Sequence, residues 1–103
     1  MGEHALPISL DHERLTEFCR RYHIRRLALF GSVLRPDFGP DSDVDVLVEF
    51  EKDHTPGFAL IRMERELSSL LGGRLVDLVT PGFLNHRMRD RVLAEAQEQY
   101  AAR

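Results

Sequence analysis

The stretch LFGSVLRPDFGPDSDVDVLVEF, residues 29–50, decides how this chain folds and raises its main chemical question. An apolar run stops at Gly31 and Ser32, a loop rich in Pro, Gly and Asp follows, and a second apolar run opens with Asp43 and Asp45. Alternate residues of a strand share one face, so these two carboxylates point the same way. Because ionised carboxylates are costly to bury and repel one another, the pattern indicates that something positive lies among them.

Six elements are predicted around this stretch from hydrophobic periodicity and turn residues. The predicted order is α-β-β-α-β-α. Helices are expected over about residues 10–23, with Ser9 as N-cap, 57–71 and 85–100. Strands are expected over about residues 25–30, 44–50 and 74–80. The loop after the first strand is long enough for a short helix starting near Ser32, and the helix between the second and third strands favours a parallel pair. The predicted class is therefore α+β, with a small mixed sheet packed against helices and one face partly open.

Length, charge and cysteine usage limit the classes of protein that this chain can be. A single domain is expected over residues 1–103, because 103 residues with 43% hydrophobic content allow one modest core. The net charge of -3 argues against direct nucleic-acid binding through a broad basic surface. One cysteine excludes an internal disulfide and favours the cytoplasm, and no apolar run approaches the roughly 20 residues that span a bilayer. The histidines show no zinc-like spacing and are expected at the surface: His4, His12, His23, His54 and His86.

A third carboxylate lies in the predicted strand over 74–80. Asp77 shares a face with Leu75 and Val79, so it would meet Asp43 and Asp45 if the two strands were neighbours. Three converging carboxylates form an all-oxygen site suited to Mg²⁺ or Mn²⁺.

These aspartates also have other interpretations. The alternative for Asp43 and Asp45 is a purely structural role as turn or cap residues. The alternative for Asp77 is an ion pair with a neighbouring arginine. Asp41 is interpreted as a loop former. The spacing of the aspartates also imitates an EF-hand loop, but that motif requires Gly and Glu where this chain has Val46 and Lys52.

Gly31 and Ser32 form the second part of the predicted site. Glycine at the end of a strand lets a ligand approach the backbone closely, because no Cβ intervenes. A short helix starting at Ser32 would also present free N–H groups and a hydroxyl to phosphate oxygens. A Gly-Ser pair alone usually means only a turn, so its weight comes from its spacing to Asp43 and Asp45.

The full pattern resembles the nucleotidyltransferase superfamily typified by DNA polymerase β, and in particular the minimal nucleotidyltransferases. The resemblance is carried by LALFGSVLR, DSDVDVLVEF and RLVDLVT in that order, and it covers nearly the whole chain. One departure is visible, since many relatives have Arg-Gly after the Gly-Ser turn where this chain has Arg35 followed by Pro36. That change affects the path of the loop and a triphosphate contact by Arg35, but it leaves the carboxylates in place.

The resemblance implies a polymerase β-like fold and specific roles for the site residues. Asp43 and Asp45 would coordinate two Mg²⁺ ions, with Mn²⁺ as a substitute, and would bind the nucleotide through them. Asp77 would hold the ion on the acceptor side and help to deprotonate the attacking hydroxyl. Gly31 and Ser32 would hold the β- and γ-phosphates of ATP.

The resemblance also implies a partner, because minimal nucleotidyltransferases are paired with HEPN ribonuclease toxins. As antitoxins of HEPN/MNT systems they transfer AMP from ATP to a tyrosine of the toxin, which would make this chain a protein adenylyltransferase. The candidate docking surfaces are the open sheet face and the arginine-rich segment 85–91. The alternative interpretation of this segment is an ordinary solvated helix face. Two other functions stay open: a catalytically silent antitoxin that neutralises its partner by binding, and a standalone transferase acting on a small-molecule hydroxyl.

Overall fold

The computed structural model describes residue 8 and residues 10–39, 41–54 and 56–102. Its elements in chain order are α1 (His12–Arg21), β1 (Ile24–Phe30), the 3-10 helix η1 (Gly31–Leu34), β2 (Val44–Phe50), α2 (Ala59–Leu70), β3 (Val76–Val79), the 3-10 helix η2 (Pro81–Phe83), α3 (His86–Glu95) and β4 (Gln97–Ala101). The predicted α+β class is confirmed, and the predicted short helix after the first strand is η1. The predicted N-cap Ser9 lies outside the described residues. The N-cap of α1 is Asp11, whose carboxylate accepts hydrogen bonds from the backbone N–H groups of Glu13 and Arg14 at 3.1 and 3.3 Å.

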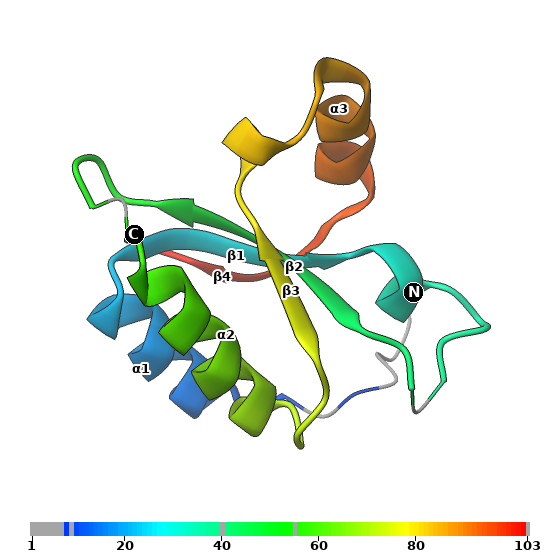
Figure 1. The fold of residues 1–103 in the computed structure, drawn as a ribbon, viewed down its shortest axis with the longest axis horizontal. Coiled ribbons are helices and arrows are strands. Elements are labelled where there is room, and N and C mark those ends of the chain that lie inside the picture. The colour runs from blue at the N-terminus through cyan, green and yellow to red at the C-terminus, as the bar shows by residue number, and fades with distance from the viewer. Residues whose placement is uncertain (1–7, 9, 40, 55, 103) are drawn as a thin grey trace.

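The sheet has four strands in the order β3-β2-β1-β4 (Figure 1). The pair β2 and β3 is parallel, as the intervening helix α2 predicted, whereas β1 runs antiparallel to both β2 and β4. The sheet is therefore mixed, and the start of β2 lies beside the start of β3. This arrangement brings the acidic ends of these two strands to one edge of the molecule.

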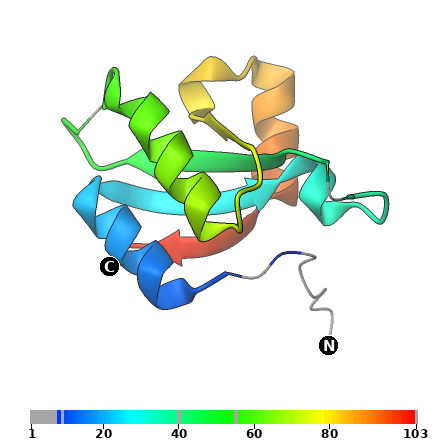
Figure 2. The same ribbon diagram turned by 60° about the horizontal axis from the view of Figure 1, so that its bottom comes forward.

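Helices α1 and α2 cover one face of the sheet, and α3 lies on the other side (Figures 1 and 2). The core forms between the sheet and the first two helices, because alternate residues of β1 and β2 point toward them. These residues are buried with the apolar stripes of both helices: Leu15, Phe18, Cys19, Ile24, Leu27, Leu29, Val44, Val46, Val48, Met63, Leu67 and Leu78. The sequence prediction that Cys19 is a core residue is confirmed, since its side chain is fully buried.

The final helix predicted over 85–100 is correct only in its first part. Asn85 caps α3 by accepting a hydrogen bond from the Met88 N–H at 2.9 Å, but the helix ends at Glu95 and residues 97–101 form β4. Ala96, the residue between α3 and β4, has φ -62° and ψ 137°, which is extended backbone. Tertiary structure explains why the helix ends early. The edge of β1 has backbone N–H and C=O groups that pair with residues 97–101 and that a longer helix would leave unpaired.

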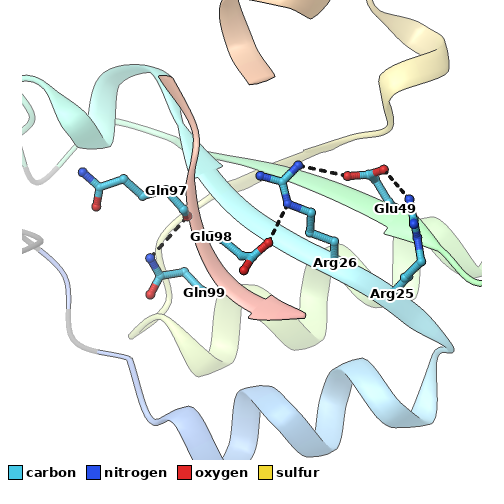
Figure 3. Close-up of polar contacts among 6 residues, drawn as sticks. All are labelled: Arg25, Arg26, Glu49, Gln97, Glu98 and Gln99. Atoms are coloured by element: carbon cyan, nitrogen blue, oxygen red, sulfur yellow. Dashed lines mark hydrogen bonds and ion pairs between the residues drawn. The ribbon is translucent and has the colours of Figure 1, made fainter. Parts of the chain in front are cut away.

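Charged side chains join three strands on the face of the sheet away from α1. Figure 3 shows Arg26 of β1 reaching between Glu98 of β4 and Glu49 of β2, with nitrogen to oxygen distances of 2.9 and 3.1 Å. A β-bulge between residues 24 and 26 also brings Arg25 to Glu49, at 2.8 Å. Because α3 lies over the same side, this face is partly covered and partly open (Figure 1).

No helix within the described ranges is both long enough and apolar enough to cross a membrane.

Candidate active site

Two of the predicted carboxylates face each other across the parallel pair of strands. Asp45 of β2 is the direct partner of Asp77 of β3 in the register, between the pairs Val44 with Val76 and Val46 with Leu78. Partners in a ladder put their side chains on the same face of the sheet. Asp45 is half-buried, whereas Asp77 is exposed. The structure therefore brings together two aspartates that are far apart in the sequence.

Asp43 lies one residue before β2 and is exposed. The pKa of the Asp45 carboxyl is raised, first by burial and then by the charges of Asp77 and Asp43, so both neighbours lie close enough to act on it. Two groups oppose this rise: a hydrogen bond from the Ser32 backbone N–H and the positive charge of Arg35. The arrangement is a cluster of negative charge around a partly desolvated carboxylate.

The turn at Gly31 is built around Asp45. Gly31 has a φ of +74°, in the left-handed region that favours glycine. A Cβ added at this position would lie 3.2 Å from Cγ of Asp45 and would overlap its Oδ2 atom. The sequence predicted that glycine here lets a ligand approach the backbone, but the group that lies against Gly31 in the structure is the side chain of Asp45.

Ser32 joins the same turn to the start of β2 through two hydrogen bonds. Its backbone N–H donates to the Asp45 carboxylate, and its hydroxyl donates to the backbone carbonyl oxygen of Asp43 at 3.1 Å. Neither bond was expected, since the sequence suggested that these donors face outward. The turn and the acidic residues therefore form one connected unit.

Arg74 holds the loop between β1 and β2 in place. Its Nη1 atom donates to the Gly39 carbonyl oxygen at 3.0 Å, and its guanidinium carbon lies 4.7 Å from the centre of the Phe38 ring. Ser42 closes the loop, since its hydroxyl accepts from the Gly39 N–H at 3.1 Å and its own N–H donates to the Gly39 carbonyl oxygen at 3.1 Å. Sequence reasoning missed Arg74, because nothing local marks a contact between residues 35 apart.

The donor atoms of this site are oxygens, with an arginine and a glycine-containing turn beside them. Carboxylate oxygens suit hard divalent cations such as Mg²⁺ and Mn²⁺. The Arg35 guanidinium and the Ser32 hydroxyl suit the oxygens of a phosphate chain. Asp43 and Asp77 are exposed, so their side chains are free to turn toward a ligand beside Asp45.

The chain is similar to known proteins in sequence and in overall fold. A family model described as a nucleotidyltransferase domain matches residues 12–98. The protein adenylyltransferase MntA of Thermococcus cleftensis is 40% identical over 80 residues, which cover 77% of this chain and 78% of that protein. A solved structure of a candidate minimal nucleotidyltransferase is 40% identical, with a TM-score of 0.69 over 82% of this chain and 85% of the other.

A solved toxin-antitoxin structure with AMP-PNP is also similar in fold. Its TM-score is 0.71, and the match covers 91% of this chain and 76% of the other. The two sequences are 20% identical, so this likeness concerns the fold alone.

Proposed function

This chain belongs to the nucleotidyltransferase domain family, and from that premise we propose that it transfers AMP from ATP to a hydroxyl of a partner toxin and so acts as its antitoxin. One observation carries the proposal: Asp45 lies opposite Asp77 in parallel strands and contacts the turn at Gly31 and Ser32. A relative with 40% identity is named a protein adenylyltransferase, which supports a protein as the acceptor. The acceptor group that we propose is a tyrosine hydroxyl of a HEPN-type ribonuclease toxin.

The oxygens of the three aspartates do not all lie within 4.8 Å of one another, so the exposed Asp43 and Asp77 would turn toward Asp45 to hold a pair of divalent cations. We expect Asp43 and Asp45 to hold two Mg²⁺ ions, with Asp77 on the acceptor side, and Mn²⁺ to substitute for Mg²⁺. Support comes from the all-oxygen donor set and from the raised pKa of Asp45, which burial raises most and the charges of Asp77 and Asp43 raise further, because a bound cation would offset both causes. When bound, Mg²⁺ supplies positive charge that offsets the triphosphate and the charge developing as pyrophosphate leaves.

The residues of the chain itself would position the reactants. Ser32 would release the Asp43 carbonyl oxygen and turn its hydroxyl to the phosphates, and Arg35 would add positive charge beside Asp45. Asp77, the exposed carboxylate, would accept the proton of the attacking hydroxyl. The half-buried Asp45 would stay fixed by the Ser32 N–H, which keeps the site preorganised.

Residues 1–103 would act as one nucleotidyltransferase domain, with the acceptor brought by the partner. Candidate docking surfaces are the partly open face of the sheet and the segment 85–91, in which most side chains are exposed. Both lie on the α3 side of the sheet (Figure 1).

The test is a transfer assay with the product of the adjacent gene, which the proposal expects to be a small all-helical toxin. Purified chain and toxin are incubated with Mg²⁺ and with ATP labelled at either the α- or the γ-phosphate. Transfer of AMP labels the toxin only from the α-position, and mass spectrometry should place the adduct on a tyrosine. Label from the γ-position would instead indicate a kinase and would contradict the proposal.

Two variants complete this assay. Asp43→Asn should reduce transfer by about 100-fold or more, because it removes a proposed ligand of the ions. Asp41→Asn is the matched control, since Asp41 is an exposed loop residue two positions away and should transfer AMP as the unmodified chain does. An Asp43→Asn protein that still neutralises the toxin without labelling it would favour the catalytically silent antitoxin.

A further inference from the structure

A second cluster of ligating side chains lies at the opposite end of β2 from the aspartates. It consists of His23, Glu51 and His54, and one ligand atom from each lies within 4.8 Å of those of the other two. Glu51 follows β2 directly, so it is about 20 Å along the strand from Asp45 at roughly 3.3 Å per residue. We propose that these three residues bind a borderline transition-metal ion, with Zn²⁺ as the best match.

The backbone holds His23 beside Glu51. His23 follows the C-cap of α1 and has a φ of +56°, a left-handed conformation that histidine adopts more readily than most residues. Its carbonyl oxygen accepts a hydrogen bond from the Glu51 N–H at 2.8 Å, next to the paired residues Ile24 and Phe50. As a result, Nδ1 of His23 lies 3.8 Å from Oε1 of Glu51.

A tight turn brings the third residue back to the same point. The His54 N–H donates to the Glu51 carbonyl oxygen at 3.0 Å, and Asp53 within the turn has a φ of +67°. The ring of His54 therefore stacks on the ring of His23, with centroids 3.9 Å apart and an angle of 19° between the planes. The cluster therefore depends on left-handed backbone conformations at two non-glycine residues, His23 and Asp53.

The chemistry of the cluster selects the class of ion. Two imidazole nitrogens and one carboxylate oxygen match a three-ligand zinc site that leaves a fourth position for water. Mg²⁺ is disfavoured, because it prefers oxygen ligands throughout. The side chains of His23 and Glu51 are 52% and 44% exposed, so an ion can enter from solvent and the near-parallel rings have room to tilt toward it.

The bound ion would link two segments that are distant in the sequence. His23 belongs to the turn between α1 and β1, while Glu51 and His54 belong to the turn that leads from β2 toward α2. Closing this connection stabilises the folded state only, since the unfolded chain does not hold the three ligands together. Zn²⁺ should therefore raise the unfolding temperature of the protein, by an amount that grows with the logarithm of the Zn²⁺ concentration relative to its dissociation constant.

The experiment measures Zn²⁺ affinity of the untagged full chain by competition with a chromophoric chelator. Glu51→Gln and His54→Asn should each weaken Zn²⁺ binding by about tenfold or more, because each removes a ligand while conserving shape. His23→Asn should do the same, and asparagine is chosen because it tolerates the left-handed backbone. Circular dichroism without metal checks that all three variants fold.

Matched controls separate this cluster from other groups that bind metals. His12→Asn and His86→Asn remove exposed histidines outside the cluster, and Asp45→Asn disables the aspartate site. All three should bind Zn²⁺ as the unmodified chain does. The proposal is overturned if the Glu51→Gln and His54→Asn proteins keep the unmodified affinity, or if Zn²⁺ binding is lost in Asp45→Asn instead.

Discussion

Replacing Gly31 by alanine tests whether the turn is built around the Asp45 carboxylate. The new Cβ would meet Asp45 at less than 3.0 Å, whereas ordinary van der Waals contact starts at 3.4 Å. The carboxylate must then move by at least the difference, 0.4 Å. That movement strains or breaks its hydrogen bond from the Ser32 N–H, which holds the side chain in place.

The expected losses follow from two separate costs. Holding a non-glycine residue in the left-handed region costs roughly 1–2 kcal/mol, partly offset by the lower entropy of the unfolded chain. The clash with Asp45 adds a cost typical of overpacking, about 1–3 kcal/mol. AMP transfer should fall by roughly 10- to 100-fold, since a displacement of about 1 Å in a catalytic group costs about 100-fold.

Gly72→Ala is the control that separates these costs. Gly72 follows α2 with a φ of +77°, but an added Cβ would meet nothing within 4 Å. Urea unfolding of both variants gives the backbone cost from Gly72→Ala and the clash from the difference. Transfer to the toxin is measured in parallel with labelled ATP, and the Gly72→Ala enzyme should keep its full rate.

Two results would refute this reasoning. Gly31→Ala could unfold at the same urea concentration as Gly72→Ala, which would mean that Asp45 yields without cost. Alternatively, Gly31→Ala could transfer AMP at the unmodified rate, which would mean that the position of Asp45 does not matter for the chemistry.

Three further predictions use other contacts. Asp45→Asn should raise the free energy of unfolding of the metal-free protein at pH 7. Burial is the main reason that the pKa of Asp45 is raised in the native state, so ionisation of this carboxyl costs stability once the pH rises above 3.8, and asparagine avoids that cost. Urea unfolding should show this advantage disappear near pH 3, and an equal advantage at both pH values would contradict it. Arg26→Met should cost roughly 1 kcal/mol, because Glu49 and Glu98 lose the cation between them, and the cost should shrink in concentrated salt. Arg74→Gln should destabilise the fold by about 1 kcal/mol and slow AMP transfer severalfold, because it releases the loop before β2. Transfer kinetics at saturating ATP measure this effect. An unchanged rate would show that other contacts hold the loop.

Local sequence pattern was sufficient for the elements whose side chains alternate or repeat clearly. The strand over 44–50 was predicted with its observed bounds, because valines alternate with other residues and turn residues precede them. The helix α2 was predicted from its apolar stripe, and its place between two strands correctly indicated a parallel pair. The residue types of the aspartate site were also visible, since paired carboxylates beside a Gly-Ser turn are chemically unusual.

The same local pattern misjudged the end of the chain. Residues 97–101 read QEQYA, with few residues that favour strands, and they continued the helical spacing of the segment before them. They form β4 because the edge of β1 supplies hydrogen-bond partners, with Tyr100 opposite Leu27. The partner that decides this element is more than 60 residues away, at Arg26 to Leu29, so no local window contains it.

By itself, then, the sequence determined the α+β class and the parallel pairing of β2 with β3, and it predicted which residues are candidates for the chemistry. Only the tertiary structure decided which of those residues meet. It put Asp77 opposite Asp45, made the Asp45 side chain the group that Gly31 accommodates, and collected His23, Glu51 and His54 from two separate turns. The physical reason is that the periodicity of a segment depends only on how that segment lies against a core. The positions of side chains relative to one another depend instead on strand register and on positive-φ turns, and these follow from the packing of distant segments.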